Sequence, residues 1–220
     1  MAALRLNRST WAAFALLNLL LLALIALLLQ FRGERAELAR LDQLGAAVYP
    51  APAPLSGITL ADQHGAPFGL GDMLGRWNLV FFGFTNCPDM CPMALAELGD
   101  FYRARDESAA PAQVVFVSVD PADTPETIKN YLAGFHVDFI GLSGGVEAVA
   151  ALAAQLFVNT GAGDMAGPGH GHAADAPEGI ISHSIHIGVV SPAGELVGLL
   201  RPPHRAAAIA EALEMIARRG

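Results

Sequence analysis

Cysteine is scarce in this sequence of 220 residues, which contains only Cys87 and Cys91. So small a number excludes the secreted scaffolds that several disulfides hold together. Basic residues are also few, since residues 41–220 contain 8 Lys and Arg against 19 Asp and Glu, a net charge of −11. We therefore expect no nucleic-acid partner, because nucleic-acid-binding surfaces are basic. The sequence has no internal repeat, which excludes repeat architectures.

One long hydrophobic run lies near the N-terminus. Residues 11–29 contain no charged residue and one polar residue, Asn18, and they are long enough to span a bilayer as a helix. Signal-peptide cores are usually shorter, and no small-residue cleavage site follows directly, so the pattern favours an uncleaved single-pass anchor over a cleaved signal. Arginines flank both ends of the run, so the positive-inside rule leaves its orientation open.

The rest of the sequence is predicted to form a linker and one folded domain. Residues 1–10 are a short tail before the anchor at 11–29. Residues 30–54 begin as a charged helical extension and end rich in proline and alanine, as linkers do. The domain is expected at residues 55–220, which are enough to bury a core. Within it, residues 159–179 are rich in glycine, alanine and proline and are expected to be a mobile loop.

Strand-like and helix-like patterns alternate along this domain. That order predicts an α/β fold with a partly parallel sheet and helical crossovers. Strand-like segments are found at 77–84, 113–120, 138–142 and 183–200, and helix-like segments at 93–105, 124–135, 146–156 and 203–219. A short hairpin is expected at 58–70 with His64 and Gly65 in its turn, and Thr124 is the expected N-cap of its helix.

The two cysteines lie four residues apart, directly after an apolar strand-like run. Each precedes a proline, Pro88 or Pro92, which disfavours helical geometry at the residue before it. We therefore expect both cysteines in a loop, with Pro92 as the first residue of the following helix. The positive end of that helix dipole would lower the thiol pKa values and favour thiolates.

Two thiolates on one short loop can chelate a soft ion such as Cu(I), and a neutral imidazole from elsewhere could complete a three-coordinate site. The same pair could instead carry out thiol chemistry. A plain structural disulfide is the less favoured alternative, because closing so short a loop contributes only roughly 2 kcal/mol. Structural zinc normally needs four protein ligands, and the sequence has no second cysteine pair.

Three blocks of the sequence resemble the Sco/SenC family. They are FFGFTNCPDMCPMALAEL, VVFVSVDPADTPETIKNYLAGF and HSIHIGVVSPAGELVG, which occur in the family's order within residues 55–218. The resemblance implies a thioredoxin-like domain on a transmembrane helix that binds one copper, as Cu(I), Cu(II) or both, through Cys87, Cys91 and His183. Where the family usually has an aspartate directly before this histidine, the sequence has Ser182.

The resemblance also implies partners and a location. The copper would be delivered to the dinuclear copper centre of cytochrome c oxidase, on its copper-bearing subunit, and other copper chaperones or thioredoxin-like reductants would be further partners. The family's bacterial members imply an anchor in the cytoplasmic (inner) membrane with the domain on the periplasmic side.

Other residues could add donors near the cysteines. His170 and His172 either form a weak second metal site or are solvated loop residues. His186 follows His183 by three residues, so on an extended strand the two side chains point to opposite faces and only one can face the loop. We assign that place to His183 and an ordinary structural role to His186.

Methionines and aspartates also surround the motif. Thioethers are soft donors, but Met93 is expected to pack in the core and Met90 to shield the site. Asp120 and Asp123 follow a strand, so they could touch the site, although turn formation and helix capping explain them equally well. Asp89 is expected to be a turn residue.

Two functions from different classes therefore remain. The first is a copper metallochaperone, which is not an enzyme in the sense of catalytic turnover. The second is a thiol–disulfide oxidoreductase in which Cys87 and Cys91 reduce the cysteines of a partner before metallation. A peroxiredoxin-like peroxidase fits poorly, because Thr85 lies two residues before Cys87 and those enzymes place a threonine three residues before the reactive cysteine.

Overall fold

The computed structural model describes residues 8–106, 109–158 and 185–219, and the chain forms two compact units, Met1–Gln43 and Leu44–Gly220. The first unit consists of the helix α1 (Arg8–Gln43). This helix contains the predicted anchor, and its length and composition are sufficient to cross a membrane. Asn18 donates its side-chain amide to the Phe14 carbonyl at 2.8 Å, so the polar residue of the apolar run is satisfied within the helix, as a bilayer would require.

The second unit is built on one mixed sheet of eight strands. In space the strands follow the order β1-β8-β7-β4-β5-β6-β2-β3. Their bounds are β1 Ala46–Pro54, β2 Leu60–Asp62, β3 Pro67–Phe68, β4 Trp77–Gly83, β5 Ala112–Ser118, β6 Ile140–Ser143, β7 Ile187–Val190 and β8 Glu195–Leu200. The strands β4, β5 and β6 are parallel and the other pairs are antiparallel. The predicted partly parallel sheet is confirmed.

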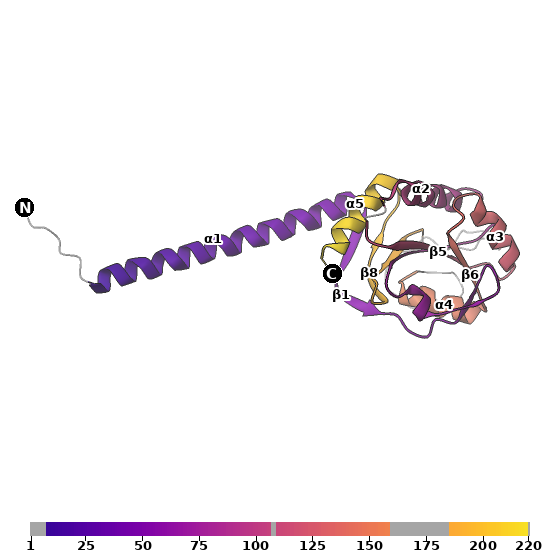
Figure 1. The fold of residues 1–220 in the computed structure, drawn as a ribbon, viewed down its shortest axis with the longest axis horizontal. Helices are drawn as coiled ribbons and strands as arrows, with labels where there is room; N and C mark the ends of the chain where they lie inside the picture. Colours follow the sequence, from indigo (N-terminus) through magenta and orange to yellow (C-terminus); the bar gives the residue numbers. More distant parts are fainter. Residues whose placement is uncertain (1–7, 107–108, 159–184, 220) are drawn as a thin grey trace, which may run out of the picture. The chain divides into compact units, whose positions relative to one another are not determined.

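Helices cover both faces of the sheet. They are α2 (Met90–Ala104), α3 (Pro125–Ala133), α4 (Val146–Gln155) and α5 (Ala206–Ala217), with a 3-10 turn at Leu70–Met73. Figure 1 shows α4 on one side of the sheet and α2, α3 and α5 on the other. Every residue of β4 is buried, because it lies between β7 and β5 and is covered on both faces. Alternate β4 residues Val80 and Phe82 pack with Leu152 of α4 in one core.

The local signals in the sequence are also found in the structure. The strands β2 and β3 pair as the expected hairpin, and Gly65 in its turn has a φ of 79°, which glycine adopts without strain. The Asp62 carboxylate accepts the backbone N–H groups of His64 and Ala66, each at 2.8 Å, and so closes the turn. At the start of α3, the Thr124 side chain accepts the Thr127 N–H, which confirms the predicted N-cap.

The expected linker at residues 30–54 is not a linker along its whole length. Its first part continues α1 to Gln43, and its proline- and alanine-rich part is the strand β1, which pairs with β8 from Ala46↔Leu200 to Pro54↔Glu195. Proline is compatible with this strand because β1 lies at the edge of the sheet, where one row of N–H groups has no ladder partner. The compact unit therefore begins at Leu44, not near Leu55.

This pairing predicts that a fragment of residues 55–220 is less stable than one of residues 44–220. The shorter fragment loses the five residue pairs that join β1 to β8, and at roughly 0.2–1 kcal/mol each this loss is on the order of 2 kcal/mol. Urea unfolding of the two fragments measures the difference. Equal free energies of unfolding would contradict a structural role for β1.

Candidate functional site

The two cysteines lie where the central strand β4 passes into α2. A loop of residues 84–89 joins Gly83 to the helix, with the Cys87 N–H donating to the Phe84 carbonyl at 3.2 Å. Cys87 is in this loop and is half-buried, whereas Cys91 is in the first turn of α2 and is 0% exposed. The expectation that both cysteines lie in the loop was wrong for Cys91. The helix begins at Met90, and Pro92 is compatible with its first turn because N–H groups there have no helical partner.

The helix start brings the two sulfur-containing side chains together. The backbone N–H of Cys91 donates to the Cys87 Sγ at 3.4 Å, which satisfies one of the first N–H groups of the helix. No disulfide joins the two residues. The structure is therefore that of the reduced pair, with Cys87 partly exposed and Cys91 inside the domain.

The buried position of Cys91 depends on a glycine at the end of β4. A Cβ atom at Gly83 would lie 3.1 Å from the Cys91 Sγ and 2.8 Å from the Cε2 atom of Phe116. Both distances are shorter than ordinary van der Waals contacts. Glycine at this position therefore leaves the space in which the sulfur of Cys91 packs against the centre of the sheet.

Burial decides the protonation of Cys91. Removal from water raises the pKa of its thiol to about 12, and the hydrogen bond with Cys87 also raises it. The expectation of a lowered pKa at the helix N-terminus was therefore wrong for this residue, because desolvation outweighs the hydrogen bond with the Phe84 backbone, which lowers the pKa. The Cys91 thiol is protonated at neutral pH in the absence of a metal, and any metal that binds its sulfur must displace that proton.

A buried carboxylate holds the cysteine loop against the next strand. Asp123, which is 7% exposed, accepts the backbone N–H of Thr85 at 2.9 Å and the Thr85 hydroxyl at 2.5 Å. It also accepts the Ser118 hydroxyl, at the end of β5, at 2.6 Å. Asp123 thus fixes the first part of the cysteine loop. By contrast, Asp120 accepts the Ala122 N–H in the turn itself.

Tyr131 brings a phenol close to the cysteines from α3. Its hydroxyl is buried and has no hydrogen-bond partner among the residues that the structure describes. Burial raises the pKa of this phenol, and the nearby Cys91, Cys87 and Asp123 raise it further. Tyr131 was not predicted from the sequence as part of the site, although its position on the helix that follows Asp123 was a possible signal.

A second residue that sequence reasoning missed is His204, between β8 and α5. Its Nε2–H donates to the Ile185 carbonyl at 2.7 Å. Ile185 lies two residues after His183 in the chain. Burial lowers the pKa of His204, and the neighbouring His186 lowers it further. The pKa of His186 is itself lowered by burial and by Arg201. Neutral His204 therefore holds Ile185, which lies just before β7, through this hydrogen bond.

One of the two methionines beside the cysteines differs from expectation. Met93 was expected in the core, but it is 60% exposed, and Met90 is 41% exposed. The residues of α2 that face the core near this end are instead Cys91, Ala94 and Leu95. Asp89 is the N-cap residue of α2 and its carbonyl accepts the Met93 N–H, which agrees with its predicted role in the turn.

The predicted histidine ligand is not among the residues that the structure describes. His183, Ser182, His170 and His172 all lie in the range 159–184, as does the expected loop at 159–179. Among residues 8–106, 109–158 and 185–219, no three His, Cys, Asp or Glu side chains lie close enough together to hold a metal ion. Within these ranges, the cysteine pair is therefore not joined by a third His, Cys, Asp or Glu side chain that could complete such a group.

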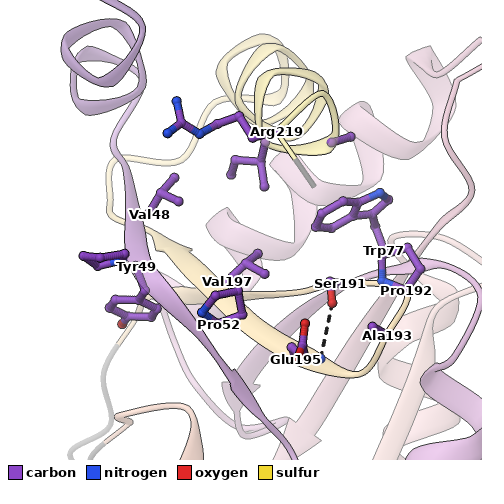
Figure 2. A pocket seen from close by; sticks show the side chains of 13 residues that line it. Val48, Tyr49, Pro52, Trp77, Ser191, Pro192, Ala193, Glu195, Val197 and Arg219 are labelled. Carbon is purple, nitrogen blue, oxygen red and sulfur yellow. Dashed lines mark hydrogen bonds between the residues drawn. The ribbon is translucent and has the colours of Figure 1, made fainter. Parts of the chain in front are cut away.

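A cavity of about 550 Å³ lies away from the cysteines. Its lining includes Tyr49 of β1, Trp77 of β4, Glu195 of β8 and Ile216 of α5, and Figure 2 shows the indole of Trp77 beside it. Trp77 is the first residue of β4, whereas the cysteine loop follows its last residue. The cavity is therefore at the opposite end of the central strand, and neither cysteine lines it.

We expect Asp123→Ala to destabilise the domain by about 1–3 kcal/mol, because the hydroxyls of Thr85 and Ser118 lose their acceptor in a buried place. The variant should also increase the rate at which iodoacetamide modifies Cys91, since the loop is no longer held. Asp120→Ala is the matched control and should change both quantities little. Equal effects of the two substitutions would contradict the role given to Asp123.

The lowered pKa of His204 predicts a loss of stability on acidification. The unfolded chain takes up a proton on this residue near pH 6.5, whereas the folded chain does so only at lower pH, so protons favour unfolding in that window. His204→Gln, which can still donate to the Ile185 carbonyl, should lose less stability than the wild type as the pH falls through about 6.5. Chemical unfolding at several pH values tests this, with the exposed His64→Gln as control. A parallel dependence in wild type and His204→Gln would refute it.

The sequence of this chain is similar to those of known proteins. The profile of the SCO1/SenC family matches residues 55–218. A relative from Stutzerimonas stutzeri is 35% identical over 172 residues, which are 75% of this chain and 78% of that protein. The bovine mitochondrial "Protein SCO2 homolog" is 32% identical over 169 residues, 76% of this chain and 60% of the relative. The chain thus spans less than two thirds of the bovine protein.

Solved structures with the same fold include copper-bound members. Bradyrhizobium japonicum ScoI with copper bound has a TM-score of 0.58 and 29% identity, covering 76% of this chain and 99% of that one. Apo Sco1 from Thermus thermophilus has a TM-score of 0.61 and 30% identity, covering 79% and 95%. The predicted thioredoxin-like fold is confirmed, and the chain belongs to the SCO1/SenC family.

Proposed function

We propose that this chain is a membrane-anchored copper metallochaperone that delivers copper to the dinuclear copper centre of cytochrome c oxidase. Copper, as its cargo, is held by the thiolates of Cys87 and Cys91 and by the imidazole of His183. The observation that carries this proposal is the reduced cysteine pair at the end of β4, with the Cys91 N–H 3.4 Å from the Cys87 Sγ, in a chain of the SCO1/SenC family. Two sulfur donors suit a soft ion such as Cu(I).

The different exposure of the two sulfurs supports a transfer function. Cys87 is half-buried and Cys91 is fully buried, so an incoming ion or partner reaches Cys87 first. Binding to Cys91 requires loss of its proton, which makes retention of copper dependent on deprotonation in the interior. The exposed thioethers of Met90 and Met93 lie beside the pair on the outer face of α2.

The anchor and the acidic charge support the proposed setting. The apolar part of α1 is suited to a single-pass anchor in the bacterial cytoplasmic membrane. The soluble unit would then lie on the periplasmic side, where the copper-bearing subunit of the oxidase, other copper chaperones and thioredoxin-like reductants are its proposed partners. The net charge of −11 beyond residue 40 favours cationic partners over anionic ones.

A thiol–disulfide oxidoreductase is the second candidate function. The favouring observation is again the pair itself, since a half-exposed Cys87 can attack a partner's disulfide and the buried Cys91 can then resolve the mixed disulfide. In this reaction the partner's disulfide is reduced to two thiols, and the Cys87–Cys91 pair is oxidised to a disulfide. The two functions compete for the same sulfurs, because only the reduced pair can bind copper.

Copper stoichiometry distinguishes the two functions. We expect the reduced full-length chain in detergent to retain one copper, Cys87→Ala and Cys91→Ala to retain none, and His183→Ala to bind at least about tenfold more weakly, because one of three ligands is lost. His64→Ala, in the exposed hairpin turn, is the matched control. Copper is measured after gel filtration, and its affinity by competition with a chelator of Cu(I).

Normal copper content in Cys91→Ala would overturn the metallochaperone proposal. Absence of copper from the wild type, together with rapid reduction of a disulfide-containing peptide, would favour the oxidoreductase instead. Unchanged affinity in His183→Ala would remove only the histidine from the proposed ligands.

A further inference from the structure

The cavity of about 550 Å³ beside Trp77 belongs neither to the cysteine site nor to the proposed copper function. Its size falls within the range of about 300–1,000 Å³ that is usual for ligand pockets in proteins. All its lining residues belong to the unit Leu44–Gly220, so it is a feature of the folded domain itself. Its lining is mostly apolar with a few polar side chains, which is the usual form of a binding site.

The cavity arises from an irregularity in the pairing of β1 with β8. The strands pair on both sides of residues 49–52, but only one β8 residue, Val197, lies opposite these four residues. The extra chain bulges away from β8, since a regular ladder matches one residue with one. Val197 and residues of the bulge line the cavity, and Figure 2 shows β1 across the cavity from Trp77. Bulges are frequent next to functional sites.

The walls of the cavity are suited to an extended, proline-rich segment. The indole of Trp77 forms one wall, and the rings of Pro50, Pro52 and Pro192 also line the space. Aromatic-lined grooves bind polyproline II segments, whose conformation is preformed and therefore loses little entropy on binding. Pro50 and Pro52 are exposed on an edge strand, so the cavity opens at the edge of the sheet and a longer chain can pass through it.

Addition of a β-strand is disfavoured along the same stretch of the edge. Strand addition requires N–H groups of β1 to donate to the incoming chain, and Pro50 and Pro52 have none. A polyproline II segment needs no such ladder, because its rings and side chains pack into the groove. The prolines of β1 therefore favour this form of extended ligand over a strand.

Glu195 places a negative charge at one side of the cavity. Its backbone N–H donates to the Ser191 hydroxyl at 3.3 Å, but its carboxylate has no hydrogen bond or ion pair among the residues that the structure describes. Figure 2 shows the guanidinium of Arg219 on the other side of the cavity, away from Glu195. A half-buried carboxylate attracts a cation more strongly than a fully exposed one. The ligand is therefore expected to carry Lys or Arg beside its prolines.

We propose that this cavity binds a proline-rich segment of a partner protein in polyproline II conformation, with a Lys or Arg of that segment paired to Glu195. The prolines of the segment pack against Trp77 and against the bulge of β1. The inference does not depend on copper, because neither cysteine lines the cavity.

The position of the cavity allows both ends of β4 to be used at once. Trp77 is the first residue of this strand and Gly83 the last, so at roughly 3.3 Å per residue the two ends lie about 20 Å apart. A segment bound beside Trp77 leaves the cysteine loop uncovered. The domain can thus hold a partner at one end of β4 while its cysteines react at the other.

The test uses the full-length chain in nanodiscs of phosphatidylcholine, because detergent could enter an apolar cavity and this neutral lipid does not attract basic peptides. The two tryptophans, Trp11 and Trp77, are replaced by fluorotryptophan during expression, and Trp11→Phe assigns their fluorine NMR signals. The probe is the acetylated and amidated peptide KPPLPPLPPK, which has lysine at both ends so that either direction of binding can reach Glu195. The comparison ligands are EPPLPPLPPE, KAALAALAAK and phenethylammonium.

We expect KPPLPPLPPK to shift the Trp77 signal saturably and to leave the Trp11 signal unchanged. EPPLPPLPPE should bind at least about tenfold more weakly, because the carboxylate of Glu195 repels it. KAALAALAAK should also bind at least about tenfold more weakly, because it lacks both the proline rings and the preformed conformation.

Variants of the chain locate the binding site. Glu195→Gln should weaken binding of KPPLPPLPPK about threefold to fivefold, as loss of a partly exposed ion pair does. The matched control is Glu147→Gln, an exposed residue of α4 on the other side of the sheet, which should change nothing. Val197→Phe places a larger side chain in the cavity and should abolish binding.

A Trp77 signal that does not shift saturably up to about 1 mM KPPLPPLPPK would overturn the inference. Equal affinity for KAALAALAAK or phenethylammonium would also overturn it, because the cavity would then not select for prolines. Undiminished binding in Val197→Phe would place the peptide elsewhere and refute the assigned site. The peptide comparisons use the wild-type chain, so they decide the matter even if Val197→Phe does not fold. None of these results depends on copper, so the proposed function stands or fails separately.

Discussion

The carboxylate of Asp123 is the interaction on which the geometry of the site depends. The cysteine loop leaves the sheet at Gly83, and without a fixed point its half-exposed part would have many conformations. By accepting both the N–H and the hydroxyl of Thr85, and the hydroxyl of Ser118, Asp123 joins the loop to the end of β5. Because α3 begins directly after Asp123 at its Thr124 cap, the same residue links the loop to the helix that carries Tyr131.

The buried end of the site follows from this arrangement. With the loop fixed, α2 begins at Met90 and directs Cys91 into the space above Gly83, where desolvation keeps its thiol protonated. Cys87 remains in the loop and accepts the Cys91 N–H. The result is a pair whose members differ in access to solvent, an arrangement that suits both metal transfer and thiol exchange.

The sequence allowed the central part of the fold to be predicted, because β4 and β5 are continuous apolar runs and α3 has a clear cap. The strand β1 could not be recognised, since a proline-rich segment has the composition of a linker and only its pairing with β8 makes it a strand. Met93 was also expected in the core, although the helix turns that residue to solvent.

The cysteine pair was identified from its spacing, but the protonation of Cys91 was not predicted. The pKa of Cys91 depends on its burial, and the bonds of Asp123 join residues 38 positions apart, so neither follows from local sequence. The same is true of Tyr131, whose neighbours come from three separate segments. The sequence shows the type of donor, whereas the tertiary structure determines which donors are buried and which are fixed by hydrogen bonds.

Gly83 also sets a limit on how this site can change, in evolution or by design. Its absent side chain is the space shared by a sulfur and an aromatic ring, so even one added methyl group would displace either Cys91 or Phe116. The start of α2 has exposed positions, such as Met90, that can vary without such a clash. In a redesign of this centre for another soft ion, exposed positions such as Met90 can therefore be changed, whereas the position next to the Cys91 sulfur must remain glycine.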